Sequence, residues 1–246
     1  MSRLPILCYH NIGQAPAAGR FALLHVVEAR FERQLWTLRR LGLRGVSMTE
    51  GLAHLRDGRR RGAVALTFDD GYMDTLTAAL PLLRRYDCRA TCYLVSDRIG
   101  GHNQWDDGEG RERQALMTRE QIGLWLEAGM EIASHSCSHP WLENLDAPEA
   151  AGEVSDSRNA LQRMFGARVD HFAYPFGSFT PTVIDAVKRC GYASAVTTEP
   201  RIAGPGDDVY RLPRMIVDGR RGLLRFLWQL VKPHDELRHG RGLFRR

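Results

Sequence analysis

The chain has 246 residues, of which 43% are hydrophobic and 26% charged, and its formal net charge is +5. This length is ordinary for one α/β barrel, and folding would bury roughly 70–75% of the surface of the unfolded chain. The basic residues are scattered rather than gathered in a stripe with aromatic residues, so we expect no nucleic-acid partner. No stretch approaches the ~20 apolar residues of a membrane-spanning helix.

In chain order, the first half alternates between strand-like and helix-like patterns. It predicts a strand over residues 4–9, a helix over 28–41, a strand over 63–68, a helix over 74–86 and a strand over 90–95. Gly42 is the expected end of the first helix. Pro81 is expected to kink the second, because proline lacks the amide hydrogen that the helix needs.

The second half continues the alternation after a charged, glycine-rich loop at residues 99–117. It predicts a helix over 118–129, a strand over 130–133, a helix over 148–165, a strand over 171–174, a helix over 180–191 and a strand over 193–197. Thr118 and Gln121 form the predicted capping box of the helix over 118–129. Gly166 is the expected end of the helix over 148–165.

Polar residues that follow the predicted strands indicate which parallel fold forms. Strands that alternate with helices pair in parallel, either in a (β/α) barrel or in an open doubly wound sheet. Strand ends are followed by His10, Asp69, Asp70, His135 and Tyr174. Because the C-terminal ends of the strands form the active-site rim of (β/α) barrels, this placement favours an α/β barrel with one site at its mouth.

Two of these polar clusters have the composition of a metal site. Catalytic zinc commonly takes three protein ligands from His, Asp and Glu and leaves one position open. Asp70, His135 and His139 can provide such a set, and Asp69 is then left as a base for metal-assisted hydrolysis. The alternative is that the two aspartates only form an Asx turn.

Three motifs resemble those of the polysaccharide deacetylases, the NodB-homology family or carbohydrate esterase family 4. Residues 67–72 (TFDDGY) are similar to its first motif, 135–139 (HSCSH) to its second and 172–177 (FAYPFG) to its third. The resemblance implies a distorted, seven-stranded (β/α) barrel of the NodB type. It also implies Asp69 as the base and Zn²⁺, or another divalent transition metal, on Asp70, His135 and His139.

The chain departs from this family in the residue that would supply the general acid. Most members carry a late L-x-H motif, and the only match here, at His239, lies in a charged tail. His10 follows the first predicted strand in the sequence LCYH and resembles the N-terminal Y-H motif of the poly-β-1,6-N-acetylglucosamine deacetylase branch. That resemblance implies His10 as the acid, and the alternative is a structural histidine.

The third motif departs from the family as well. The family has an arginine where this chain has Ala173, and that arginine orients the catalytic aspartate. Arg214 is the expected substitute, with a plain surface arginine as the alternative. Phe176 keeps the family position whose backbone N–H helps to bind the oxyanion.

Aromatic and neighbouring residues of the motifs are expected to line a sugar cleft. The predicted substrate residues are Tyr72, Trp141, Tyr174 and Pro175, and Trp105 is a further aromatic candidate; packing in the core is the alternative for each. We divide the chain into a deacetylase domain, 1–221, and a basic amphipathic tail, 222–246. Residues 222–231 are apolar at helical spacing and flanked by arginines, so this helix either packs on the barrel or contacts an anionic membrane.

These observations predict a deacetylase that hydrolyses the N-acetyl group of an N-acetylated glycan and releases acetate. The alternatives are an inactive carbohydrate-binding relative and a hydrolase of another linear or cyclic amide. We expect a cytoplasmic protein, because the count of five cysteines is odd and the N-terminal apolar run is too short for a signal peptide. The protein would be membrane-associated if the tail binds lipid. The sequence leaves the oligomeric state open.

Overall fold

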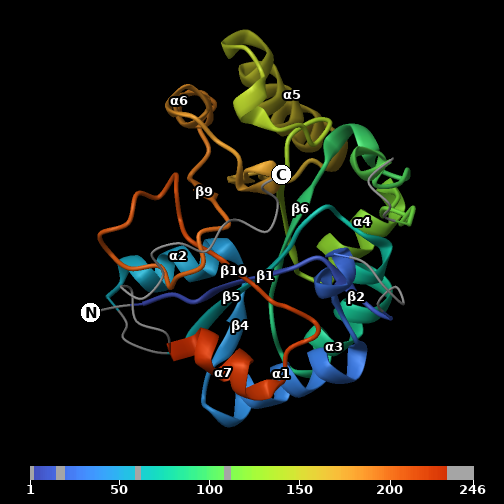
Figure 1. Cartoon of the computed structure of the whole chain (residues 1–246), viewed down its shortest axis with the longest axis vertical. Helices are drawn as coiled ribbons and strands as arrows, with labels where there is room; N and C mark the ends of the chain where they lie inside the picture. The colour runs from blue at the N-terminus through green and yellow to red at the C-terminus, as the bar shows by residue number, and fades with distance from the viewer. Residues whose placement is uncertain (1–2, 15–19, 59–61, 108–111, 232–246) are drawn as a thin grey trace.

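Residues 3–14, 20–58, 62–107 and 112–231 are described by the computed structural model of the chain, and all but two of their strands form one curled parallel sheet (Figure 1). Seven strands follow one another in the order β10-β1-β5-β6-β7-β8-β9, and β4 pairs with the first half of β5. The predicted distorted barrel with seven strands is confirmed. The strands are β1 (Ile6–Tyr9), β4 (Arg44–Val46), β5 (Ala63–Phe68), β6 (Thr91–Leu94), β7 (Glu131–Ser134), β8 (His171–Ala173), β9 (Ser194–Val196) and β10 (Met215–Ile216), with β2 (Asn11–Ile12) and β3 (His25–Val26) as a separate pair.

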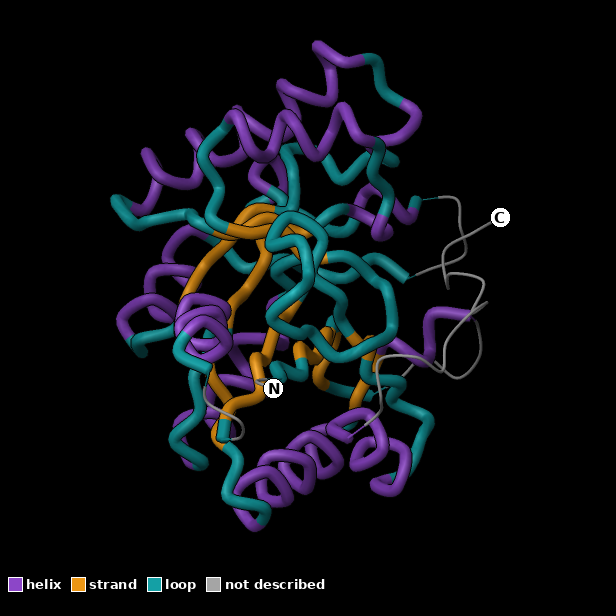
Figure 2. Tube along the Cα trace, turned by 90° about the vertical axis from the view of Figure 1, so that its left-hand side faces the viewer, coloured by secondary structure: helices purple, strands orange, loops and turns teal. Residues whose placement is uncertain are grey.

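Helices cover the outside of the strands, as Figure 2 shows. The α-helices are α1 (Glu28–Arg40), α2 (Met48–Arg56), α3 (Leu80–Arg85), α4 (Arg119–Glu127), α5 (Ala147–Phe165), α6 (Pro181–Arg189) and α7 (Leu223–Val231). Short helical turns are η1 (Arg20–Leu24), η2 (Thr75–Ala79), η3 (Ser96–Arg98), η4 (Gln104–Asp106), η5 (Leu142–Asn144) and η6 (Pro175–Gly177). The predicted kink at Pro81 takes the form of the π-helical turn η2 directly before α3, which accommodates the proline.

The alternation of side chains along β5 explains how a carboxylate reaches the barrel mouth. One set of residues packs between the sheet and the helices, namely Val64, Leu66 and Phe68. The other set packs inside the barrel, where small residues fit best, namely Ala63 and Ala65. Successive side chains of a strand point to opposite faces, so the inward series continues to Asp69 just beyond the strand end.

The α2 helix closes the opposite end of the barrel, and neither α2 nor β4 was predicted from the sequence. Ser47 caps α2 with a capping box to Glu50. Met48, Leu52 and Leu55 of the helix belong to the same buried cluster as the residues inside the barrel. The barrel is therefore closed by apolar packing at one end and lined with polar groups at the other.

Glu131, at the start of β7, binds the N-terminal end of α2 at this closed end of the barrel. Its carboxylate accepts hydrogen bonds from the Thr49 and Thr91 hydroxyls and, at 3.0 Å, from the Met48 amide, while His171 Nε2 lies 3.5 Å from Oε1. Burial raises the pKa of Glu131, but hydrogen bonding and electrostatic attraction from His171, together with the two hydroxyls, outweigh it and lower the pKa to about 2.

We expect Glu131→Gln to lower the free energy of unfolding by about 3 kcal/mol at pH 7, because a fall in pKa from 4.5 to about 2 corresponds to roughly that stabilisation. A depressed carboxyl pKa stabilises the fold fully above about pH 4.5, and the contribution disappears as the pH falls toward 2. Urea unfolding at pH 7 and pH 3 measures it. The control is Glu50→Gln in the capping box at the start of α2, and equal losses of stability in both variants would contradict the assignment.

The α7 helix, from the segment assigned to the tail, packs on the barrel. Phe226 and Leu230 are buried in the core between sheet and helices, and the Gln229 side-chain amide donates to the Ile216 carbonyl at 2.9 Å. Residues 232–246 of the tail lie outside the described part of the chain. Within the described part, no helix combines the length and the apolar character that crossing a membrane requires.

Candidate active site

Asp69 and Asp70 lie at the mouth of the barrel, directly after β5, with 3% and 4% of their surface exposed. The Asp69 amide donates to the Tyr9 carbonyl at 3.0 Å, which continues the pairing of β5 with β1. Asp70 and Gly71 then adopt left-handed backbone conformations, with φ of 74° and 80°. This turn lets two consecutive carboxylates face the same site.

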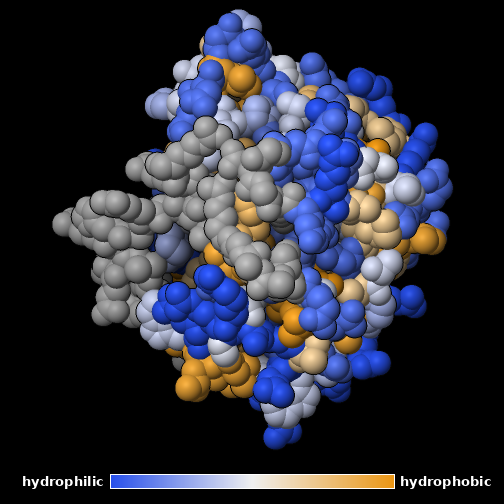
Figure 3. All heavy atoms as spheres, turned by 45° about the vertical axis from the view of Figure 1, so that its right-hand side comes forward, coloured by the Kyte–Doolittle hydropathy of each residue, from blue (hydrophilic) through white to orange (hydrophobic). Residues whose placement is uncertain are grey.

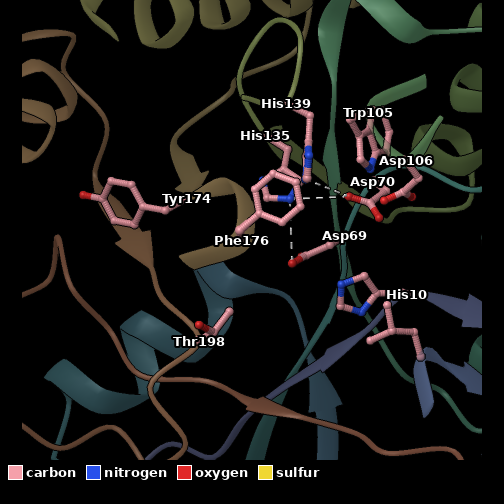
Figure 4. A pocket seen from close by; sticks show the side chains of 11 residues that line it. His10, Asp69, Asp70, Trp105, Asp106, His135, His139, Tyr174, Phe176 and Thr198 are labelled. Carbon is pink, nitrogen blue, oxygen red and sulfur yellow. Dashed lines mark ion pairs between the residues drawn. The ribbon is translucent and has the colours of Figure 1, made fainter. Parts of the chain in front are cut away.

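The second motif forms a tight loop after β7 that carries His135 and His139. Glu153 of α5 accepts hydrogen bonds from the amides of Cys137 at 2.8 Å and Ser138 at 3.0 Å, and so holds the loop from behind. The His139 amide donates to Ser136 Oγ at 3.0 Å. The loop thereby directs both imidazoles toward Asp70 (Figure 4).

Asp70, His135 and His139 form a buried cluster suited to a divalent cation. Asp70 Oδ1 lies 3.5 Å from His135 Nε2 and 3.4 Å from His139 Nε2. His135 Nδ1 lies 2.7 Å from the Ala173 carbonyl, which orients the ring with Nε2 toward the cluster, as in metal sites with a supporting carbonyl. Burial lowers the pKa of His135 and favours the neutral imidazole that binds metal. The donor set therefore fits a metal ion.

Arg214 lies against Asp69 in a bidentate ion pair, fully buried. Its two terminal nitrogens donate to Oδ1 at 2.6 Å and Oδ2 at 2.7 Å, and its Nε donates to the Thr197 carbonyl at 3.1 Å. Burial raises the pKa of Asp69, but the charge and hydrogen bonds of Arg214 outweigh it, so the pKa lies well below the usual range. Asp69 is ionised at neutral pH as a result.

Two further side chains from β1 and its end reach Asp69. The Cys8 thiol donates to Oδ2 at 3.4 Å. This contact was not predicted from the sequence, because a cysteine in a buried strand most often serves only packing. His10 lines the same pocket, and its ring nitrogen lies within 4.8 Å of the ligand atoms of Cys8 and Asp69. Figure 4 shows the His10 ring on the opposite side of Asp69 from the two metal-site histidines.

Aromatic rings stack around His139 at the edge of the pocket. Trp105 stacks on the His139 ring with centroids 4.5 Å apart, and Phe176 meets that ring edge-on at 4.5 Å. Trp141 stacks on the Phe176 ring, with centroids 4.4 Å apart. Trp105 and Phe176 line the pocket directly, whereas Trp141 reaches it through Phe176.

The other predicted substrate residues are placed differently. Tyr72 and Pro175 are buried and are not among the residues that line this pocket. Tyr174 lines it, but its side chain points away from the metal residues, and its hydroxyl donates to the Tyr210 carbonyl at 2.9 Å. Tyr174 thus lies at the wall of the pocket and Tyr72 and Pro175 lie outside it, and contact of these residues with a substrate stays a prediction. His239 lies outside the described residues.

Backbone strain is concentrated at this site. Of the five non-glycine residues with positive φ in the described chain, four belong to it: Asp70, Ser136, His139 and Phe176. Such conformations cost about 1–3 kcal/mol each and persist where the surroundings enforce them. The backbone at the mouth of the barrel therefore adopts conformations that lower stability, which is typical of functional sites.

Comparisons with known proteins point to one family. A family model described as polysaccharide deacetylase matches residues 56–195. The chain is 28% identical over 218 residues to the putative polysaccharide deacetylase YxkH of Bacillus subtilis, covering 88% of this chain and 72% of that protein. It is 24% identical over 202 residues to a poly-beta-1,6-N-acetyl-D-glucosamine N-deacetylase of Staphylococcus epidermidis, covering 78% and 68%.

The fold is also similar to solved structures. The Streptococcus pyogenes deacetylase PplD in complex with acetate gives a TM-score of 0.80 at 26% identity, over 94% of this chain and 99% of that one. The structure of IcaB from Ammonifex degensii gives a TM-score of 0.79 at 22% identity, over 94% and 98%. Both similarities extend along nearly the whole chain.

Proposed function

The chain belongs to the polysaccharide deacetylase family, and from that premise we propose that it is a metal-dependent deacetylase that removes the N-acetyl group of an N-acetylated glycan. The observation that carries this proposal is the buried cluster of Asp70, His135 and His139 beside Asp69, which Arg214 holds ionised. The acetate in the structure of the similar deacetylase PplD supports it.

Each residue of the pocket has a distinct part in the proposed reaction. Asp70, His135 and His139 would hold the metal, most simply Zn²⁺, which when bound polarises a carbonyl and lowers the pKa of water. Asp69 accepts the proton of the attacking water, and the Phe176 amide donates to the oxyanion that forms. His10 then donates a proton to the amine of the sugar as the C–N bond breaks, and acetate is released.

Acetate release from N-acetylglucosamine oligomers tests this function. We expect the zinc-loaded protein to release acetate, and a chelator to stop the release until zinc is restored. Activity only on other amides would favour the alternative amide hydrolase. Binding of the oligomers without acetate release, by protein that contains stoichiometric metal, would favour the inactive carbohydrate-binding relative.

We expect His10→Ala to lower the rate on N-acetyl sugars by roughly 10²–10⁴-fold, because a general acid contributes about this much. The rate on activated acetate esters should fall far less, since their leaving group needs no proton. Removal of residues 233–246, which include His239, should leave both rates unchanged. An active His10→Ala variant together with a folded but inactive truncated protein would assign the acid to the tail.

We also propose that one side of the barrel contacts an anionic membrane. Six large hydrophobic residues are exposed in the described chain, and four of them lie on or just after α1 and on α7: Trp36, Leu41, Leu224 and Val231. Arg30 of α1 donates to the Arg221 carbonyl at 3.0 Å before α7 begins, and Leu41 shares an apolar groove with Val231, so the two helices lie side by side.

The charges around this face fit a bilayer with acidic lipids. Arg40 lies over the Trp36 ring and Arg225 over the Trp228 ring, and α7 contains no acidic residue. Tryptophan and arginine together are typical of helices that lie in a membrane interface. In Figure 3 hydrophobic surface gathers beside hydrophilic surface along the lower edge, the end at which Figure 1 places α1 and α7.

Flotation with vesicles tests the membrane contact. The full chain should bind phosphatidylcholine vesicles only when they contain phosphatidylglycerol, and Leu224→Gln should weaken this binding several-fold, since it removes an apolar side chain that is 83% exposed. Leu124→Gln on α4, at a position 53% exposed, is the matched control. Equal binding by both variants, or self-association without lipid binding, would overturn the proposal.

A further inference from the structure

The loop that carries His135 and His139 has an unfavourable backbone. Ser136 and His139 both have a φ of 66°, in the left-handed region. Non-glycine residues in this region are strained, and they persist only where the surrounding structure enforces them. The two imidazoles nevertheless meet edge to face, with ring centroids 4.7 Å apart, and both lie beside Asp70 (Figure 4). Contacts from outside the loop must therefore hold it in this shape.

One side chain of α5, Glu153, bonds to this loop with both carboxylate oxygens. Oε2 accepts the amides of Cys137 at 2.8 Å and Ser138 at 3.0 Å, and Oε1 accepts the Ser138 hydroxyl at 2.6 Å. The Cys137 thiol donates to the main-chain carbonyl of Glu153 at 3.6 Å. Hydrogen bonds to a carboxylate are stronger than those between neutral groups. Glu153 thus joins α5 firmly to the residues between the two histidines.

The α5 helix is a fixed base for this contact. Val154, the residue after Glu153, is fully buried in the core between sheet and helices. One turn further on, the Ser157 hydroxyl lies 2.7 Å from the hydroxyl of Ser134, the residue before His135. Residues four apart on a helix share one face. The same face of α5 therefore contacts the end of β7 and the loop that follows it.

The opposite side of the loop is held by η3. The Ser96 amide donates to the Ser136 carbonyl at 3.1 Å, and the Asp97 amide donates to the Cys137 carbonyl at 3.0 Å. These are main-chain contacts, so they do not depend on which side chains are present. Glu153 supplies a side-chain contact to the same loop, and its contribution can be removed by substitution.

We propose that Glu153 is a positioning residue that determines how tightly the site binds its metal. The inference rests on the proposed metal site of Asp70, His135 and His139. Glu153 does not line the pocket and acts through the loop. Ligands that are already in place lose little conformational freedom when the ion binds, whereas a loop released from Glu153 has to be ordered first.

The zinc affinity of the full chain, measured by competition with a chromogenic chelator, tests this role. We expect Glu153→Ala to lower the affinity roughly 10- to 100-fold, the usual effect of removing a group that orients metal ligands. Glu153→Gln should lower it several-fold, because the amide oxygen still accepts main-chain amides but the charge is lost. Excess zinc should restore most of the rate of acetate release in both variants, since no reacting group is changed.

Asp156→Ala is the matched control. Asp156 lies three residues after Glu153 on α5, lines the same surface groove and carries the same charge. Its carboxylate accepts the hydroxyl of its neighbour Ser155 at 3.2 Å, and no hydrogen bond or ion pair joins it to the loop in the described chain. We therefore expect Asp156→Ala to keep the zinc affinity of the wild type.

The outcomes separate the explanations. Wild-type zinc affinity in both Glu153 variants, or in Glu153→Gln if Glu153→Ala does not fold, would overturn the proposal. A lower melting temperature of the metal-free protein without a change in affinity would show a merely structural role. An equal loss of affinity in Asp156→Ala would assign the effect to charge alone and would also overturn it. A wild type that binds zinc but releases no acetate would refute the deacetylase function and leave this inference standing, whereas a wild type that binds no zinc would refute both.

Discussion

The Asp69→Asn variant should fold, bind metal and lose roughly 10²–10⁴-fold in the rate of acetate release, the contribution of a general base. The amide side chain cannot accept the proton of water, but its oxygen still accepts a hydrogen bond from Arg214. The substitution removes one of two short hydrogen bonds and the counter-charge of the fully buried Arg214, so it should lower the stability of the protein while the three metal residues stay in place.

Three measurements on purified Asp69→Asn separate the base from other roles: metal content, thermal unfolding and the rate on glycan oligomers. Arg214→Lys is the companion variant, since lysine keeps the charge but cannot make the bidentate contact. We expect it to keep metal and lose part of the rate. If Asp69→Asn works at nearly the wild-type rate, Asp69 is not the base.

His135→Ala and His139→Ala should each lose the metal and fall roughly 10⁴-fold or more in activity, because without the ion a water with a pKa near 15.7 takes the place of one near 7. Both nitrogens lie within 3.5 Å of Asp70 Oδ1, so removal of either opens the cluster. Metal content by mass spectrometry and acetate release measure the effect.

A buried histidine elsewhere in the barrel controls for general damage to the fold. His171 is 2% exposed and begins β8, where it contacts Glu131 at the closed end. His171→Ala should lower stability but keep the metal. Full metal content in both His135→Ala and His139→Ala would show that the ligands are other residues.

The sequence predicted the alternating elements well but missed the β4–α2 unit. Arg44–Val46 is too short for a period-2 pattern, and the helix after it has no long apolar stripe because its buried side includes Gly51. Ser47 and Glu50, which form the capping box, were the available signal. Tertiary packing against the barrel end, not local propensity, determines this helix.

The site residues that directly follow a predicted strand could be predicted from the sequence. The residues whose place in the site depends on the direction of their side chains could not. Asp69 and His135 follow β5 and β7, so their meeting at the mouth follows from parallel pairing. Cys8 and Asp106 gave no such signal, because their contacts depend on strand register and on the path of a long loop. The direction of the Tyr174 side chain depends on tertiary packing in the same way, since Tyr174 lines the pocket while its hydroxyl donates to the Tyr210 carbonyl.

The ion pair between Arg214 and Asp69 has a consequence for how the protein is made. The two residues are 145 positions apart, and the segment with Arg214 pairs with β1 only through the short strand β10. A ribosome must therefore translate almost the entire described chain before the buried carboxylate meets its counter-charge, and an uncompensated buried charge is strongly unfavourable. We expect the barrel mouth to mature last, and pulsed hydrogen exchange during refolding would refute this order if the amides around Asp69 gained protection before those of β10.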